Sequence, residues 1–502
     1  MKERIVTVYM AIFISLLFSF DVFAGDILVS TPVTSKKINS AIASASPGDV
    51  VIIPDGTYYR FNQIVVPRDV DGTEANPITL KAATAGGVTF TGNSASPLIF
   101  VQGDWWIIRD FKFIDVSEVG NANTHGINTR YATGTRVTNN YFEGFGVLTD
   151  TNKNSWPVWI GHFGKGNYSR VDHNTFIENE AMGVVISSTA SHCQVDHNYF
   201  KDTLKDGSNG FSAIHVGGSD KIDLYTTVEY NVFENMSADP ETISNKSSSN
   251  TYQRNVFKST GGATAYGLVL RGGDDCIVDG NYFFDVDKQN IRVHGTGHKI
   301  INNYFENPGY SAIILAEGDN GATYANVSDI LIANNTIVKS PVRGIYIGWW
   351  PNCYVKPKNL TFKNNIIQSS TGDLITNKGY TGTFNWTTNL HYATGTATYW
   401  RNGGGGNKPG SGITHANPNL QKGQYIYRLQ ASSTNAINKG VRDINVTTDI
   451  DKNLRDASLD IGCDEFSGTI GRPISESEVG VSWLRQGTLK PPAPTSLKVV
   501  IY

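Results

Sequence analysis

The chain has 502 residues, enough for one very large domain or several of ordinary size. Its 51 glycines and its short runs of Val, Ile, Thr, Tyr and Phe, broken by Gly and Asn, are typical of β structure. The formal net charge is -3, with acidic and basic residues mixed along the chain, which gives no reason to expect nucleic acid as a partner.

The first 24 residues have the pattern of a secretory signal peptide. Lys2 and Arg4 precede an apolar run at 5–20, and a small-residue cleavage site ends at Ala24. A retained membrane anchor is the alternative, although the apolar run is short for a span. We therefore expect a mature protein that begins near residue 25, has no membrane span and is secreted or periplasmic.

The residues after the signal peptide predict a capped start. Lys36–Ala43 could form a short helix, and Ser-Pro-Gly-Asp at 46–49 reads as a turn before a strand at 50–53. Stability should come from the core rather than from disulfides or zinc, because the four cysteines are far apart and none lies in a Cys-x-x-Cys pair: Cys193, Cys276, Cys353 and Cys463.

An internal repeat then dominates the chain. The pattern apolar-x-x-Asn-x-apolar recurs at Asn140, Asn174, Asn198, Asn231, Asn255, Asn281, Asn303, Asn335 and Asn365. Repeats of roughly 20–30 residues with short strands predict stacked coils, whereas propeller blades need about 40 residues or more. We expect one all-β domain at 25–465, a parallel β-helix (solenoid), with inward Val and Phe. Each asparagine should take a left-handed conformation and turn a corner.

Three cations near the middle of the chain share this spacing. Lys246, Arg271 and Arg292 are each about one repeat apart, so they should lie on one face, about 5 Å from coil to coil. Crowded cations favour an acidic substrate and could lower the pKa of Lys246 enough to make it a base. The alternative is that each is a solvated surface charge.

Oxygen-bearing side chains should converge beside this cationic row. Asn209 precedes Glu241 by close to one long repeat, and Asp239 lies two residues before Glu241. Two carboxylates and an amide are ligands that a hard cation can use.

Three segments around these residues resemble the central motifs of polysaccharide lyase family 6, which contains alginate lyases and chondroitinase B: Asn209–Gly217, Asp239–Ser247 and Leu268–Gly273. The resemblance implies a single-stranded right-handed parallel β-helix. It also implies β-elimination of a uronate-containing anionic polysaccharide, with alginate favoured over chondroitin or dermatan sulfate. Lys246 would remove the C5 proton, and Arg271 would protonate or stabilise the leaving 4-oxygen.

The resemblance further implies calcium, held by Asn209, Asp239 and Glu241 and offsetting the substrate carboxylate. It implies substrate contacts at His215, Arg292 and His294. The chain departs from the family pattern where Asp239 replaces the commoner Glu and precedes Pro240. It also departs where Gly272 follows Arg271 in place of His, and where His215 replaces an Arg.

Two other classes of function remain open at this stage. Asp274-Asp275 with His294 resembles part of the site of polygalacturonases, which are inverting hydrolases, but the Asn-Thr-Asp expected on the preceding coil is absent. Asp274-Asp275 is better read as a turn. A glycan-binding β-helix could use Trp349 and Trp350 to stack on sugars, unless these rings fill a loop.

The repeat fades after Phe466. Pro491-Pro-Ala-Pro494 predicts an irregular tail at 466–502, and no second catalytic domain is expected.

Overall fold

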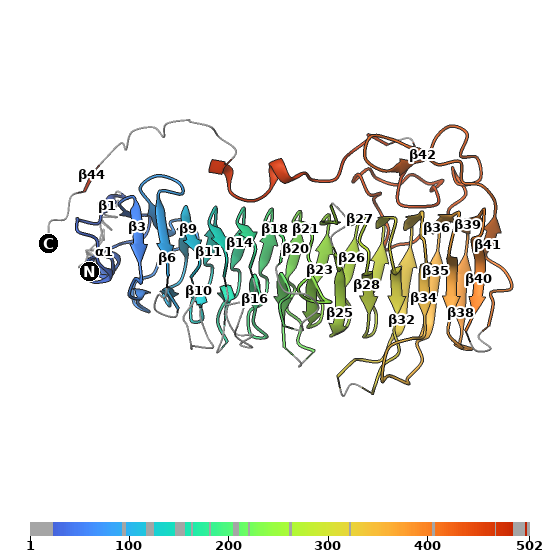
Figure 1. The fold of residues 1–502 in the computed structure, drawn as a ribbon, viewed down its shortest axis with the longest axis horizontal. Coiled ribbons are helices and arrows are strands. Elements are labelled where there is room, and N and C mark those ends of the chain that lie inside the picture. The colour runs from blue at the N-terminus through green and yellow to red at the C-terminus, as the bar shows by residue number, and fades with distance from the viewer. Residues whose placement is uncertain are drawn as a thin grey trace, which may run out of the picture.

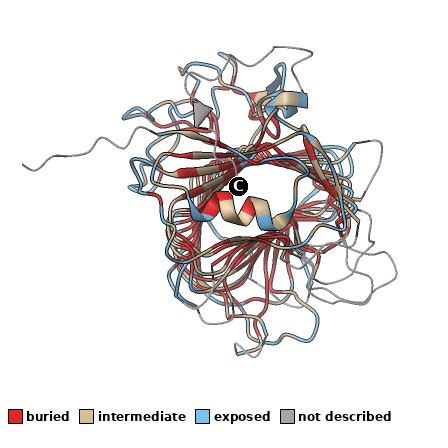
Figure 2. Ribbon diagram, turned by 90° about the vertical axis from the view of Figure 1, so that its left-hand side faces the viewer, coloured by how far each residue is buried: buried red, intermediate tan, exposed pale blue. Residues whose placement is uncertain are grey.

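The computed structural model describes residues 24–92, 97–116, 125–145, 156–161, 164–179, 182–203, 210–218, 221–260, 264–320, 323–403, 407–466, 468–484 and 497–498. Its strands wind into a parallel β-helix in which three long sheets enclose an apolar interior (Figures 1 and 2). The predicted fold class is confirmed. The predicted signal peptide, apart from Ala24, lies outside the described residues.

Each coil adds one strand to each sheet, and all strands within a sheet are parallel. Sheet A has 15 strands: β1 (Asp26–Leu28), β2 (Val50–Ile53), β5 (Ile78–Ala82), β8 (Trp106–Arg109), β11 (Arg136–Thr138), β14 (Arg170–Asp172), β17 (Gln194–Asp196), β20 (Thr227–Glu229), β23 (Thr251–Gln253), β26 (Ile277–Asp279), β29 (Lys299–Ile301), β32 (Ser328–Ala333), β35 (Lys358–Lys363), β38 (Phe384–Thr387) and β44 (Leu497–Lys498). Sheet B has 14 strands: β3 (Gly56–Tyr59), β6 (Val88–Thr91), β9 (Phe111–Ile114), β12 (Tyr141–Glu143), β15 (Thr175–Ile177), β18 (Tyr199–Lys201), β21 (Val232–Glu234), β24 (Val256–Lys258), β27 (Tyr282–Phe284), β30 (Tyr304–Glu306), β33 (Thr336–Val338), β36 (Ile366–Ser369), β39 (Asn389–Ala393) and β41 (Ile413–His415). Sheet C has 13 strands: β4 (Ile64–Val66), β7 (Ile99–Val101), β10 (His125–Thr129), β13 (Trp156–Ile160), β16 (Val184–Ile186), β19 (Ile214–Val216), β22 (Ile243–Lys246), β25 (Leu268–Gly272), β28 (Gln289–Val293), β31 (Ser311–Leu315), β34 (Arg343–Ile347), β37 (Asp373–Asn377) and β40 (Thr398–Asn402).

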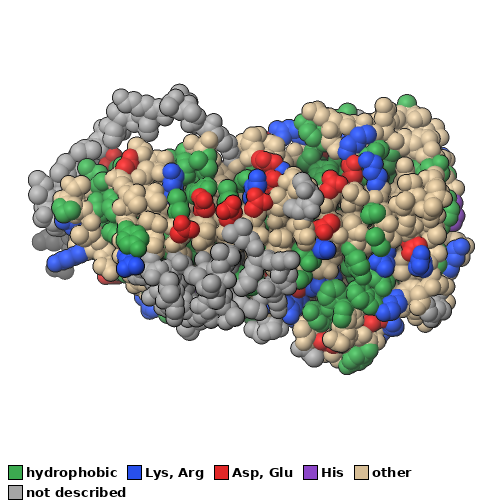
Figure 3. Space-filling model, in the orientation of Figure 1, with side chains coloured by type: hydrophobic (Ala, Val, Ile, Leu, Met, Phe, Trp, Pro, Cys, Tyr) green, Lys and Arg blue, Asp and Glu red, His purple; other side chains and the backbone are tan. Residues whose placement is uncertain are grey.

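Helix α1 (Ser35–Ala43) closes the N-terminal end of the β-helix, where it lies across the opening in Figure 2. Its N-cap residue Thr34 accepts a hydrogen bond from the backbone N–H of Lys37, and its buried face packs into the core. The helix, the turn after it and β2 match the sequence prediction. Within the described residues, no helix is both long enough and apolar enough to cross a membrane. Acidic and basic side chains are mixed over the face shown in Figure 3.

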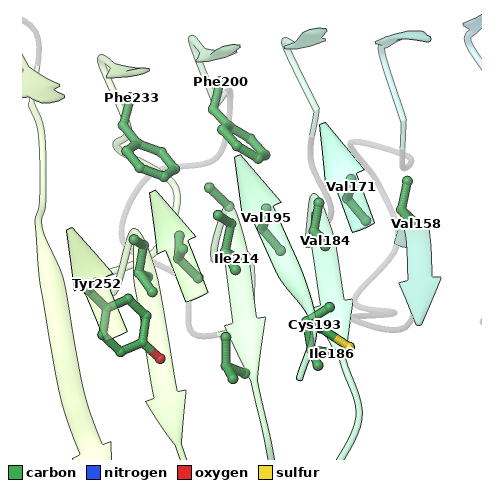
Figure 4. Close-up of a cluster of buried hydrophobic side chains, with 14 of the residues drawn as sticks. Val158, Val171, Val184, Ile186, Cys193, Val195, Phe200, Ile214, Phe233 and Tyr252 are labelled. Atoms are coloured by element: carbon green, nitrogen blue, oxygen red, sulfur yellow. The ribbon is translucent and has the colours of Figure 1, made fainter. Parts of the chain in front are cut away.

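Like residues stack on like residues inside the solenoid. One phenylalanine per coil forms a continuous stack with ring centroids 4.6–5.0 Å apart, through Phe113, Phe142, Phe176, Phe200, Phe233, Phe257, Phe283 and Phe305. Valines and isoleucines from the other two sheets fill the rest of the interior (Figure 4). The inward direction predicted for Val and Phe is confirmed, and each coil buries its apolar face only against its neighbours.

The repeated asparagines form a buried ladder of side-chain amides. Each Nδ2 donates to the Oδ1 of the next ladder asparagine at 2.9–3.2 Å, and the ladder continues one coil further than predicted, to Asn389. The predicted backbone conformation was wrong. The left-handed residue is the one before each asparagine, for example His173 and His197, both at φ 53°. The ladder residue contributes its amide instead, which satisfies backbone groups at the buried corner.

The coils end at β41, before the predicted boundary near residue 465. The segment that follows has a short antiparallel pair, β42 (Gln421–Lys422) and β43 (Tyr427–Arg428), and its buried Ile426, Ile450 and Cys463 pack on the outside of sheet B. Residues 468–484, with the 3₁₀ helices η1 (Glu476–Glu478) and η2 (Ser482–Leu484), run back along the solenoid as a C-terminal strap (Figure 1). All four cysteines are free thiols, as expected.

Candidate active site

Sheet C places His215, Lys246 and Arg271 on its outer face and Arg292 in the same column. His215 pairs in register with Ser244, Ser244 with Val269, and Val269 with Arg292. Lys246 ends β22 and pairs with Gly272 across a register shift that follows Asn245. The shift leaves Arg271 as the extra residue of a bulge, and bulges of this kind redirect a side chain. The unshifted register would already set Arg271 opposite Lys246, so the bulge keeps the two residues neighbours and changes the direction of the Arg271 side chain.

Glu241 is the carboxylate on which the cations converge. It is buried, and its Oε1 lies 2.5 Å from Nη2 of Arg292 and 3.8 Å from Nη1 of Arg271. Its Oε2 accepts a hydrogen bond from Oγ of Ser244 at 2.6 Å. Burial acts to raise the pKa of Glu241, but Arg292 and Arg271 outweigh it and hold that pKa below its usual value. Glu241 is therefore ionised and balances part of the cationic charge.

Lys246 has the environment of a potential base. Burial, and then the nearby charge of Arg271, lower the pKa of Lys246 below the ordinary lysine value, while Glu241 and Asp239 oppose this. Within the described residues Lys246 forms no ion pair. A lowered pKa and a free ammonium group increase the fraction of Lys246 that is neutral and able to accept a proton.

His215 lies on the same outer column, next to Ser244 in register, and is partly exposed. Burial, followed by the charge of Lys246, lowers the pKa of His215 to about 4. The imidazole is therefore neutral near pH 7, and it can donate or accept a hydrogen bond from a sugar. This position agrees with the predicted role of His215 as a substrate contact, which stays a prediction.

Arg292 and His294 lie behind the surface rather than on it. Arg292 is 1% exposed and His294 is fully buried. The guanidinium of Arg292 lies 3.9 Å from the ring centroid of Trp350, and the His294 ring stacks on Tyr324 at 4.8 Å. Burial, and then Arg292, hold the pKa of His294 well below its usual value. Direct substrate contact, which was predicted for both residues, does not fit this burial. Arg292 instead pairs with Glu241, and His294 packs on Tyr324.

Tyr324 and Trp350 form an aromatic cover over the arginines; sequence reasoning missed Tyr324, and for Trp350 it left sugar stacking and loop filling both open. Tyr324 lies between β31 and β32, and the guanidinium of Arg271 lies 5.3 Å from its ring centroid. Trp350 follows β34 and covers Arg292 rather than standing free for a sugar. The signal available was the wide spacing between Asn303 and Asn335, which marks a long loop in that coil.

Asp239 is engaged by the backbone on both of its oxygens. Its Oδ2 accepts hydrogen bonds from the N–H groups of Gly210 at 2.6 Å and Phe211 at 2.8 Å, and its Oδ1 accepts one from Glu241 at 3.0 Å. Burial, the largest influence, raises the pKa of Asp239. The side chain joins the segment at 210–211 to the one that carries Glu241. This role is structural and was not predicted.

Calcium fits these donors poorly. Asp239 already accepts three backbone N–H groups, and Glu241 is held by two arginines with Lys246 beside them. A dication would have to displace those partners and enter a positively charged neighbourhood. Asn209, the third predicted ligand, lies outside the described residues. Calcium binding by these three residues is untested, and the partners of Asp239 and Glu241 argue against it.

The paired aspartates of the hydrolase alternative form a turn between β25 and β26, as expected. Asp274 accepts a hydrogen bond from the N–H of Thr296 at 2.9 Å and lies 3.2 Å from Nζ of Lys221. Asp275 has a left-handed backbone at φ 57°. Asp274 is thus occupied in holding this turn, and His294 is buried away from solvent.

Comparison with known proteins identifies the family of the chain. The sequence model of the family described as chondroitinase B matches residues 33–348. The PL6 family alginate lyase AlyGC is 25% identical, with a TM-score of 0.72 over 94% of this chain and 60% of that one. The chain thus spans about 60% of the length of that lyase.

Two further solved structures show the same fold. The PL6 family polysaccharide lyase Pedsa3628 from Pseudopedobacter saltans is 21% identical, with a TM-score of 0.61 over 91% of this chain and 99% of that one. A mannuronic acid specific polysaccharide family 6 lyase from human gut microbiota is 21% identical, with a TM-score of 0.60 over 74% and 86%. Comparison with curated protein sequences gave no significant match. By the match of the family model to well over half of its length, the chain belongs to the chondroitinase B family.

Proposed function

We propose that the protein is a polysaccharide lyase that cleaves a uronate-containing anionic polysaccharide, alginate being favoured, by β-elimination. The observation that carries the proposal is Lys246, with a lowered pKa, next to Arg271 on the outer face of sheet C. The substrate class is supported by the likeness to AlyGC, whose name describes an alginate lyase. Chondroitin or dermatan sulfate is the alternative, from the description of the family that matches.

The proposed reaction uses the chain's own side chains. Neutral Lys246 takes the C5 proton of a uronate residue through Nζ. The electron pair left at C5 forms a double bond to C4, and the bond between C4 and the glycosidic oxygen breaks. Arg271 donates a hydrogen bond to that oxygen as it gains charge, and the oxygen leaves protonated with solvent as the final proton source. One product fragment has the unsaturated uronate at its new non-reducing end, and the other fragment has a new reducing end.

The C5 proton becomes acidic only when the charge on the adjacent carboxylate is offset. Arg271 and His215 both present N–H groups on the outer face beside Lys246 and can bind that carboxylate. Glu241, which is itself paired with Arg292, attracts Arg271 from behind. No step is assigned to a metal, because the described donors fit calcium poorly.

One assay separates the candidate functions. The protein is incubated with alginate, dermatan sulfate or polygalacturonate, and the ultraviolet absorbance of unsaturated uronate is followed together with new reducing ends. We expect absorbance to rise with alginate. Reducing ends without absorbance would identify a hydrolase, and neither signal would favour a glycan-binding protein.

Lys246→Ala should abolish the absorbance signal, because it removes the proposed proton acceptor. Lys299→Ala is the matched control, because Lys299 lies on β29 in sheet A, away from the site. Full activity in Lys246→Ala with normal folding would refute the mechanism.

We also propose that the mature protein is secreted or periplasmic. The pattern at residues 1–24 supports this, and the intact mass of protein recovered outside the cytoplasm tests it. A mass that includes residues 1–24 would contradict the proposal.

A further inference from the structure

The outer face of sheet C continues beyond the site as an aromatic and cationic surface. Arg292 pairs in register with Ile314, and Ile314 with Tyr346, so Tyr346 lies two strands, or about 10 Å, further along. The Tyr346 ring stacks on Trp349 at 5.6 Å, and Trp349 meets Trp350 at 5.9 Å. Trp350 in turn covers Arg292, so the surface is continuous with the site.

We name this surface the distal ledge and define it by Tyr310, Arg343, Tyr346, Trp349 and Lys378. Its aromatic members belong to one cluster with Ile314 and Ala316. In Figure 3, hydrophobic side chains gather in the part of the molecule where Figure 1 labels β28, β32 and β34, with basic side chains at the edge.

Arg343 is held between aromatic rings and keeps unused hydrogen-bonding capacity. Its guanidinium carbon lies 4.9 Å from the ring centroid of Tyr310 and 4.6 Å from that of Tyr346. Nε and Nη1 of Arg343 are enclosed, and neither has a hydrogen-bond partner among the described residues. Enclosed donors without acceptors are unfavourable in a free protein, and a planar guanidinium matches a carboxylate well.

The acid opposite Arg343 in the strand register does not neutralise it. Asp373 pairs with Arg343 in register, but its carboxylate is taken up by Nε of Arg401 at 2.6 Å and by the hydroxyls of Thr376 at 3.1 Å and Thr398 at 2.6 Å. Asp373 therefore has partners of its own, and the charge on Arg343 remains available.

A second cation lies on the same ledge. Nζ of Lys378 is 5.5 Å from the ring centroid of Trp349. In the part of the chain that the structure describes, neither Arg343 nor Lys378 forms an ion pair, whereas nearby Glu317 is paired with Lys356. The ledge thus combines two unpaired positive charges with aromatic ring faces.

We propose that the distal ledge is a binding subsite for a uronate residue remote from the bond that is cleaved. Arg343 and Lys378 bind its carboxylate, and Trp349, which is supported by the buried Tyr346, offers an apolar surface to the sugar ring. The subsite rests on the proposed lyase function, and it makes affinity depend on chain length. A short oligomer that fills only the site at Lys246 does not reach the ledge.

The test compares substrates of different length in one variant. Arg343→Gln keeps the side-chain stem and removes the charge. We expect KM for long polyuronate to rise about tenfold, as for loss of one charge-assisted contact, with kcat unchanged. Kinetic constants for the shortest oligomer that the wild type cleaves should not change. Lys358→Gln, which removes an exposed cation from β35 in sheet A, should leave both substrates unaffected.

A second variant covers the possibility that Arg343 only stabilises the two tyrosines. Trp349→Ala removes a ring face without touching Arg343 and should produce the same length-dependent rise in KM. Equal losses on short and long substrates, or no loss in either variant, would overturn the subsite.

Failure of the subsite and failure of the lyase proposal give different results. If the wild type forms no unsaturated product, the lyase proposal fails. The ledge is then judged by migration of the wild type and Arg343→Gln through native gels containing alginate. Retardation of the wild type that is lost in Arg343→Gln supports the ledge, and equal migration overturns it.

Discussion

Replacing Glu241 with glutamine removes the charge on which Arg271 and Arg292 converge. Arg292 is 1% exposed, and its Nη2 lies 2.5 Å from the lost carboxylate oxygen. The guanidinium cannot rehydrate without local opening, because Trp350 covers it. Glu241→Gln should therefore leave an uncompensated buried cation.

The expected loss of stability is about 3 kcal/mol, the lower end of the range for breaking a buried ion pair. The lower end applies because the glutamine oxygen can still accept hydrogen bonds from Arg292 or Ser244, and because the stacking of Arg292 on Trp350 is retained. Arg271, at 3.8 Å and more exposed, loses less.

Hydrogen exchange followed by mass spectrometry is the suitable assay, since each coil of a solenoid is stabilised mainly by its neighbours. Peptides covering β22, β25 and β28 should exchange about 100-fold faster in the variant, which corresponds to about 3 kcal/mol. Peptides from β5 and β8, many coils away, serve as the internal control and should not change.

A double variant tests the cause. Arg292→Met in the Glu241→Gln background removes the unpaired cation and keeps an apolar stem beneath Trp350, so it should recover at least about 1 kcal/mol. The reasoning is refuted if Glu241→Gln exchanges like the wild type at β22–β28, or if the double variant is less protected than the single one.

Three further predictions follow from the same geometry. Glu241→Gln removes a charge that raises the pKa of Lys246, so Lys246 becomes neutral at lower pH and the acid limb of kcat/KM should move to lower pH; a move to higher pH would contradict this. Chelation with EDTA should leave activity largely unchanged, whereas a loss restored by calcium would show that Asp239 and Glu241 rearrange around the ion. Asn231→Leu removes the five hydrogen bonds of this ladder side chain, at about 1 kcal/mol or more each, and should lower the thermal midpoint of unfolding; a midpoint equal to that of the wild type would contradict the ladder's role.

The regular repeat of apolar residues and asparagines was enough to predict the parallel β-helix. A coil that buries a phenylalanine and an asparagine amide must present them at the same position as its neighbours, so Phe200 and Asn198 recur one coil later as Phe233 and Asn231. The same spacing placed Lys246 and Arg271 on one face. What it could not supply was the backbone detail, because the left-handed residue precedes the asparagine whose amide satisfies the corner.

Contacts between coils decided the rest. A bulge after Asn245, which residue counting does not predict, pairs Lys246 with Gly272 and redirects the Arg271 side chain. Tyr324 and Trp350 come from loops of irregular length. The strand register does not predict which part of the surface such a loop covers. The sequence by itself thus determined the solenoid and the pair Lys246 and Arg271, since both follow from a regular repeat. Only the tertiary structure decided that Glu241 neutralises Arg292, that Asp239 serves the backbone, and that Arg343 is left unpaired, because burial and pairing depend on neighbours far apart in the chain.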